Sequence, residues 1–125
     1  KGSLSPRLID KYGNNIEAAI ESAIESALIF NKLNFNNLVI SIKTSSVYET
    51  IKANRLLTSK LDSLGLLYPI HLGVTEAGID KQGIIKSTIA IGNLLLDGIG
   101  DTIRVSLTGD PLKEIPAAQN ILNYF

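Results

Sequence analysis

The sequence predicts an α/β fold, a partial (β/α) TIM-type barrel of three to four strand-helix units with parallel strands. Helical and strand patterns alternate along the chain, and the predicted strands begin about 31 to 33 residues apart, the spacing of a barrel that divides roughly 250 residues into eight units. An open doubly wound sheet would alternate in the same way. Three or four units cannot close an eight-stranded barrel, so a closed barrel requires strands from sequence beyond this chain.

The composition indicates one globular unit without a general attraction to nucleic acid or membranes. Of the 125 residues, 45% are hydrophobic and 19% are charged, which suffices for one ordinary core. Twelve Lys and Arg balance twelve Asp and Glu, so any anion site must be local. The chain has no Cys, which excludes disulfides and Cys-ligated clusters built by this chain alone. Its apolar runs are far shorter than the roughly 20 residues that span a bilayer.

Two helices are predicted before the first strand. Ser5, Pro6 and Gly13 supply a cap, a first-turn proline and a terminating glycine for a short helix over residues 7–12. A longer helix follows the capping residue Asn15, because apolar residues recur at helical spacing from there to residue 28. A row of carboxylates on another face of this helix is expected to be solvated: Glu17, Glu21 and Glu25.

Each predicted strand is a short apolar or β-branched run, and each is followed by a helix. The strands cover residues 38–42, 69–74 and 102–107. Ser46 and Glu49 have the spacing of a capping box, so a helix begins there. A second helix is predicted over about residues 84–97, and Asp110 with Pro111 starts a last one that ends near residue 124.

The candidate site residues stand at the carboxyl ends of these strands, where parallel α/β folds bind their ligands. They are Lys43, His71, Thr75, Glu76, Arg104 and Ser106. Arg104 and Ser106 are two residues apart and point to the same side of a strand, and burying an arginine there without an anion is costly. A guanidinium, an ammonium and a hydroxyl beside helix N-termini favour a phosphate group.

Each candidate also has a structural alternative. Arg104 could pair with a neighbouring carboxylate, and His71, the sole histidine, could be a satisfied core residue. Glu76 either shuttles a proton and orients substrate hydroxyls, or caps the following segment. Lys86, expected in the first turn of a helix, would meet a bound anion or solvent. The glycines form no dinucleotide or Walker-type phosphate loop.

Several stretches of the chain carry a family resemblance. The most specific are HLGVTEAG at residues 71–78, KSTIAIG at 86–92 and GIGDTIRVSL at 98–107, and weaker ones are GSL at 2–4, KYG at 11–13 and ISIK at 40–43. In order and spacing they resemble the 4-hydroxy-3-methylbut-2-enyl diphosphate synthase family, over nearly the whole chain. The start KGS, with neither an initiator Met nor a signal-like segment, is expected of a piece of a longer protein.

This resemblance implies the later part of the family's TIM-barrel domain. The family's reaction is the reductive ring opening of 2-C-methyl-D-erythritol 2,4-cyclodiphosphate in non-mevalonate isoprenoid biosynthesis, in the bacterial cytoplasm or a plastid-type organelle. By matching motif positions, the resemblance implies that phosphate oxygens are held by Lys43, Arg104 and Ser106. It also implies that His71 and Thr75 line the pocket and that Glu76 acts near the reacting carbon as proton donor or orienter.

The resemblance further implies a [4Fe-4S] cluster, ligated by three Cys and a Glu of a separate C-terminal domain and supplied with electrons by ferredoxin or flavodoxin. A homodimer is among the expected assemblies. This chain has no Cys, so we expect it to be inactive alone. Two alternatives stay open: another phosphate- or pterin-binding barrel enzyme, and a non-catalytic α/β binding module with Arg104 in an ion pair.

Overall fold

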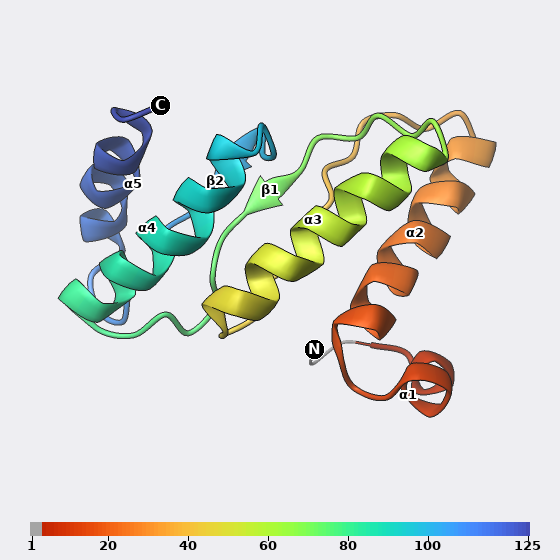
Figure 1. The fold of residues 1–125 in the computed structure, drawn as a ribbon, viewed down its shortest axis with the longest axis horizontal. Coiled ribbons are helices and arrows are strands. Elements are labelled where there is room, and N and C mark those ends of the chain that lie inside the picture. The colour runs from red at the N-terminus through yellow and green to blue at the C-terminus, as the bar shows by residue number, and fades with distance from the viewer. Residues whose placement is uncertain (1–3) are drawn as a thin grey trace.

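The structure consists of one layer of helices that covers one face of three parallel extended segments (Figure 1). It is a computed structural model and describes residues 4–125, so the GSL stretch lies partly outside the described residues. Helices α2 to α5 follow one another in chain order across the layer, each packed on the next. The helices are α1 (Pro6–Tyr12), α2 (Ile16–Lys32), α3 (Val47–Ser63), α4 (Asp80–Leu96) and α5 (Glu114–Leu122), with a short 3₁₀ turn, η1 (Pro111–Lys113), before α5. The strands are β1 (His71–Leu72) and β2 (Thr102–Ile103).

The predicted caps at Asn15, Ser46 and Asp110 are confirmed, whereas Ser5 precedes α1 without a side-chain cap hydrogen bond. The Asn15 side chain accepts a hydrogen bond from the Ala18 amide at 3.0 Å, and the Ser46 hydroxyl accepts one from the Glu49 amide at 3.2 Å. Asp110 caps η1 in the same way. Each cap satisfies an N–H group that has no partner inside its own helix, which typically contributes about 1 kcal/mol.

The parallel arrangement is confirmed, but the strands are shorter than predicted. His71 pairs with Thr102, and Leu72 pairs with Ile103. The segment 38–42 forms only an isolated parallel bridge, from Ile40 to Ile70. In place of a longer ladder, the Ile42 carbonyl accepts a hydrogen bond from the buried side chain of Asn54 in α3, at 3.2 Å. A side chain of the helix layer thereby binds the carbonyl group that a continuous strand would hydrogen-bond to its neighbouring strand.

Helix α4 begins four residues earlier than predicted, because Gly83 does not interrupt it. A Cβ atom on Gly83 would lie 2.6 Å from the Leu107 side chain and 2.8 Å from the Gly78 carbonyl oxygen. This glycine therefore permits close packing inside the helix rather than a turn before it. Lys86 consequently lies beyond the first turn and is exposed, so the expectation that it stands at the helix start is wrong.

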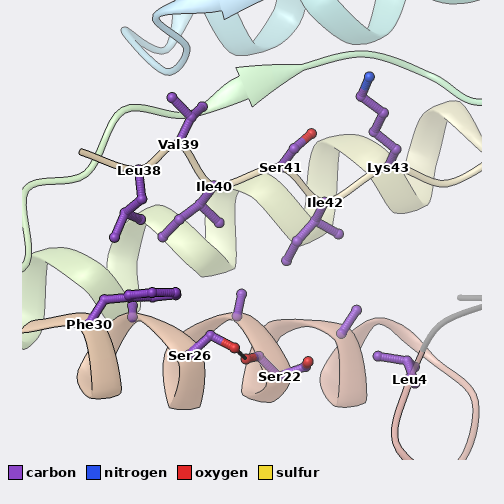
Figure 2. A pocket seen from close by; sticks show the side chains of 13 residues that line it. Leu4, Ser22, Ser26, Phe30, Leu38, Val39, Ile40, Ser41, Ile42 and Lys43 are labelled. Carbon is purple, nitrogen blue, oxygen red and sulfur yellow. Dashed lines mark hydrogen bonds between the residues drawn. The ribbon is translucent and has the colours of Figure 1, made fainter. Parts of the chain in front are cut away.

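The extended segments have one apolar face and one polar face. Figure 2 shows Ile40 and Ile42 pointing toward α2, while Ser41 and Lys43 point to the opposite side. The buried residues of the segments continue this alternation and join the side chains of α2, α3 and α4 in the main core: Ile40, Ile42, Ile70, Leu72 and Val105. Burying each such side chain contributes roughly 1.5–3 kcal/mol. No helix within residues 4–125 combines the length and apolarity that crossing a bilayer requires.

We expect Leu57→Ala to destabilise the fold strongly. The Leu57 side chain is 0% exposed in the centre of α3, and truncation leaves a cavity that typically costs about 2–5 kcal/mol. The free energy of unfolding from urea denaturation of the full-length protein measures this loss. Leu67→Ala is the control, because Leu67 is 90% exposed. Equal denaturation midpoints for the two variants would contradict this packing.

Candidate anion-binding site

The polar face of the parallel segments brings Lys43, Gly73 and Arg104 into one row. The bridge from Ile40 to Ile70 and the pairing of Leu72 with Ile103 set the register that aligns these three positions. A Cβ atom on Gly73 would lie 2.8 Å from the Arg104 carbonyl oxygen and 3.3 Å from Lys43 Cε. The Lys43 side chain therefore lies across Gly73, toward the strand that carries Arg104.

Two cations share this row, and the pKa of Lys43 reflects both its burial and the nearby positive charge of Arg104. Burial lowers the pKa of the half-buried Lys43 ammonium below its ordinary value, and the Arg104 guanidinium lowers it further, whereas Glu114 raises it. Within residues 4–125 the ammonium forms no ion pair. An anion between the two cations would remove this repulsion and accept charge-assisted hydrogen bonds.

Arg104 forms an ion pair with Glu114, the first residue of α5. Arg104 Nε donates to Glu114 Oε2 at 3.2 Å, and the Leu107 amide donates to Glu114 Oε1 at 3.1 Å. The ion-pair alternative for Arg104 is thus confirmed as a contact. The expectation of a buried arginine is wrong, since its side chain is 58% exposed, against 12% for Glu114. The other guanidinium donors form no hydrogen bond to the described residues.

His71 lies on the polar face beside the two cations and is not part of the apolar core, so the core alternative is wrong. Its Nδ1 atom and the Thr102 hydroxyl are 2.7 Å apart, and the Ser41 hydroxyl donates to the His71 carbonyl at 2.9 Å. Burial, then Lys43 and Arg104, lower the pKa of His71 below its ordinary value. The imidazole is therefore neutral at pH 7.

Thr75, Glu76 and Ser106 follow the row toward the carboxyl ends of the segments. The Thr75 amide donates to the Thr44 carbonyl at 3.0 Å, and the side chains of Thr75 and Ser106 are half-buried. Glu76 is exposed and has a left-handed backbone, with φ of 50°. This conformation costs a non-glycine residue roughly 1–3 kcal/mol and is concentrated at functional sites.

The capping alternative for Glu76 is wrong. Helix α4 has Ile79 at its N-cap and no side-chain cap bond. The Glu76 carboxylate makes no hydrogen bond or ion pair to residues 4–125, so it is available to a ligand.

Sequence reasoning missed Glu114 and Thr102. Glu114 is an ordinary helix-start residue by pattern and lies in none of the motifs, whereas Thr102 lies inside the GIGDTIRVSL stretch but is not singled out within it. Ten residues separate Glu114 from Arg104, and a carboxylate in a first helical turn is usually assigned to the helix dipole. Only the tertiary structure, in which α5 begins beside the end of β2, shows that Glu114 accepts a hydrogen bond from the Arg104 guanidinium.

The chain matches the family model of the GcpE TIM-barrel domain over residues 1–119. The chain belongs to this family. The 4-hydroxy-3-methylbut-2-en-1-yl diphosphate synthase (ferredoxin) of Thermosynechococcus vestitus is 54% identical over 121 residues, which cover 97% of this chain and 30% of that protein. The synthase (flavodoxin) of Chlamydia pneumoniae is 50% identical over 123 residues, 98% of this chain and 20% of that protein. The predicted family is confirmed, and this GcpE chain spans less than a third of the length of these relatives.

We expect the pKa of His71 to rise when Lys43 is replaced by Gln. A nearby positive charge opposes protonation of the imidazole, so removing it makes the proton easier to bind. NMR titration of the full-length protein, with the His71 signal assigned by its loss in His71→Gln, measures the shift. A pKa that stays constant or falls would contradict the proximity of Lys43 and His71.

We expect Gly73→Ala to weaken pyrophosphate binding about tenfold or more, because overpacking by one methyl group typically costs about 1–3 kcal/mol. The added Cβ meets the Arg104 backbone at 2.8 Å and the Lys43 side chain, so the two cations must separate. Calorimetric titration of the full-length protein with inorganic pyrophosphate measures the affinity. Gly92→Ala is the control, since its Cβ would meet only Phe125 at an ordinary 3.6 Å. Equal affinities in both variants would show that Gly73 does not shape the site.

Proposed function

We propose that the protein containing this chain is a 4-hydroxy-3-methylbut-2-en-1-yl diphosphate synthase. The chain supplies the later part of its substrate-binding barrel, and its three parallel segments pair with strands from the rest of the protein. The reaction is the reductive ring opening of 2-C-methyl-D-erythritol 2,4-cyclodiphosphate. The printed names of relatives at 50–54% identity support this proposal. The observation that carries it is the row of two cations around Gly73 on the polar face.

The row suits a diphosphate because the anion supplies hydrogen-bond acceptors and negative charge for the two cations. The Lys43 ammonium has three donors and no ion-pair partner within residues 4–125, and Arg104 keeps its Nη donors free. Ser106 adds a hydroxyl on the strand of Arg104. Each hydrogen bond to a charged group contributes about 1.5–3 kcal/mol. A bound diphosphate would also relieve the repulsion that lowers the pKa of Lys43.

The remaining candidates serve the organic part of the substrate. Glu76, with its unengaged carboxylate at the strand-to-helix turn, donates a proton near the reacting carbon or orients a substrate hydroxyl. His71, neutral at pH 7 and in contact with Thr102 through Nδ1, keeps Nε2 for a hydrogen bond to the substrate, beside Thr75. Neutral His71 adds hydrogen bonding without a third positive charge in the row.

The residues of this chain do not fit an iron-sulfur cluster. The sequence contains no Cys, and residues 4–125 hold no group of three His, Cys, Asp or Glu side chains suited to a metal ion. We propose that the [4Fe-4S] cluster is bound elsewhere in the protein and supplies the electrons for the reaction. The names of relatives print ferredoxin or flavodoxin, which we propose as the electron donor. The proposed assembly is a homodimer, and the proposed location is the bacterial cytoplasm or a plastid-type organelle.

We expect Arg104→Ala and Lys43→Gln to weaken binding of the cyclodiphosphate about 10- to 100-fold each, since each removes a charge-assisted contact. Equilibrium titration of the full-length protein under anaerobic conditions measures the affinity, and turnover should fall with it. Arg7→Ala is the matched control, because Arg7 of α1 pairs with Glu25 of α2, and these two helices lie at the opposite end of the molecule from α5 (Figure 1).

The Arg104–Glu114 ion pair supports a second candidate, a non-catalytic α/β module in which this arginine is structural. The same titration separates the two candidates. An Arg104→Ala variant with unchanged affinity for the cyclodiphosphate favours the module and contradicts the synthase assignment. Membership of the GcpE family favours the synthase over another phosphate- or pterin-binding barrel enzyme.

A further inference from the structure

Glu114 connects two parts of the site that are not adjacent in sequence. It is the first residue of α5, and its two carboxylate oxygens accept from different groups: Oε1 from the Leu107 amide and Oε2 from Arg104 Nε. Its side chain is only 12% exposed, although the arginine that it holds is 58% exposed. The carboxylate is therefore anchored to the backbone at Leu107, beyond the end of β2, and the exposed guanidinium is anchored to the carboxylate.

We propose that Glu114 is the positioning residue of the anion site, holding Arg104 by Nε so that its Nη groups are aligned for a diphosphate. This inference rests on the proposed function. A guanidinium offers five N–H donors in a rigid planar fork, and the contact with Glu114 uses the one on Nε. Within residues 4–125 no group accepts a hydrogen bond from the four Nη donors, so they stay available in a plane that Glu114 orients. An arginine held in this way loses less conformational entropy when the anion binds.

The location of Glu114 keeps its carboxylate charged. The hydrogen bond from the Leu107 amide lowers the pKa of Glu114 below its ordinary value, and the contacts with Arg104 lower it further. Its place in the first turn of α5 adds the favourable end of the helix dipole. An ionised Glu114 also lets Lys43 and Arg104 share one row before substrate arrives, since it offsets their mutual repulsion.

Two effects of Glu114 on substrate binding have opposite signs. Its negative charge repels an incoming diphosphate, whereas its hydrogen bond with Arg104 Nε orients the guanidinium for binding the diphosphate. The contact geometry favours the second effect, because the carboxylate is bound on both oxygens and its charge is already partnered by Arg104. The affinity of a variant that keeps the shape of the side chain and removes its charge decides between them.

We expect Glu114→Gln to raise the KM and Kd for the cyclodiphosphate about 5- to 30-fold, a typical coupling between directly contacting residues. The value of kcat should change less, because substrate binding at saturation realigns Arg104. Steady-state kinetics and equilibrium titration of the full-length protein measure these quantities. Glu25→Gln is the matched control, since it removes an exposed ion pair with Arg7 away from the site.

A double-mutant cycle distinguishes positioning from mere support of the fold. In an Arg104→Ala background, Glu114→Gln should change the affinity less than about twofold, because the residue that it positions is gone. An equal loss in both backgrounds would mean that Glu114 acts through Leu107 alone and would overturn the proposal. Unchanged or tighter binding in Glu114→Gln alone would also overturn the proposal, because it would show that Glu114 orients nothing that the diphosphate needs or acts only by repelling it.

A shorter acid provides a second variant in case Glu114→Gln does not fold. Glu114→Asp keeps the charge and loses one methylene group, so it cannot reach both partners, and we expect an affinity between those of the wild type and Glu114→Gln. Wild-type affinity in Glu114→Asp would overturn the positioning role. If the unaltered protein fails to bind the cyclodiphosphate, or Arg104→Ala binds it normally, the proposed function fails and this inference with it. Tight binding that depends on Arg104 and ignores Glu114 overturns this inference alone.

Discussion

The parallel register between segments that are about 30 residues apart in sequence is the constraint on which the site depends. Side chains alternate between the two faces of each segment, so a shift of one residue would turn Lys43 or Arg104 toward the helices. The apolar alternate positions, such as Ile42 and Leu72, prevent that shift because they are buried against the helix layer. The packing of the apolar face thus sets the chemistry of the polar face.

Glycine at position 73 makes room for the Lys43 side chain beside the strand that carries Arg104. The Lys43 side chain and the Arg104 carbonyl oxygen lie so close to Gly73 that a Cβ atom there would clash with the oxygen and crowd the lysine. Burial is the largest cause of the lowered pKa of Lys43 and of His71, and the neighbouring positive charges lower both further, which is the electrostatic cost of this arrangement. Sites that bind anions commonly store such unfavourable charge in the free state, because the ligand offsets it on binding.

The Arg104–Glu114 pair shows that a structural ion pair and a ligand contact are not exclusive alternatives. A guanidinium has donors on more than one edge, and Glu114 uses only Nε. Whether such an arginine binds an anion is decided by what engages its remaining donors. In the described part of the chain no group binds the remaining donors of Arg104, so the ion pair is compatible with a role in substrate binding.

The sequence by itself determined the α/β class, the helix caps at Asn15, Ser46 and Asp110, and the family, because these follow from short-range hydrogen bonds, apolar periodicity and continuous motifs. It also identified Lys43 and Arg104 as candidates, since both stand on predicted strand ends. Only the tertiary structure decided the short ladder, the helical position of Gly83, the exposure of Arg104 and the part played by Glu114. These features depend on contacts between distant segments, and no local pattern encodes which carboxylate, amide or glycine will meet across the fold.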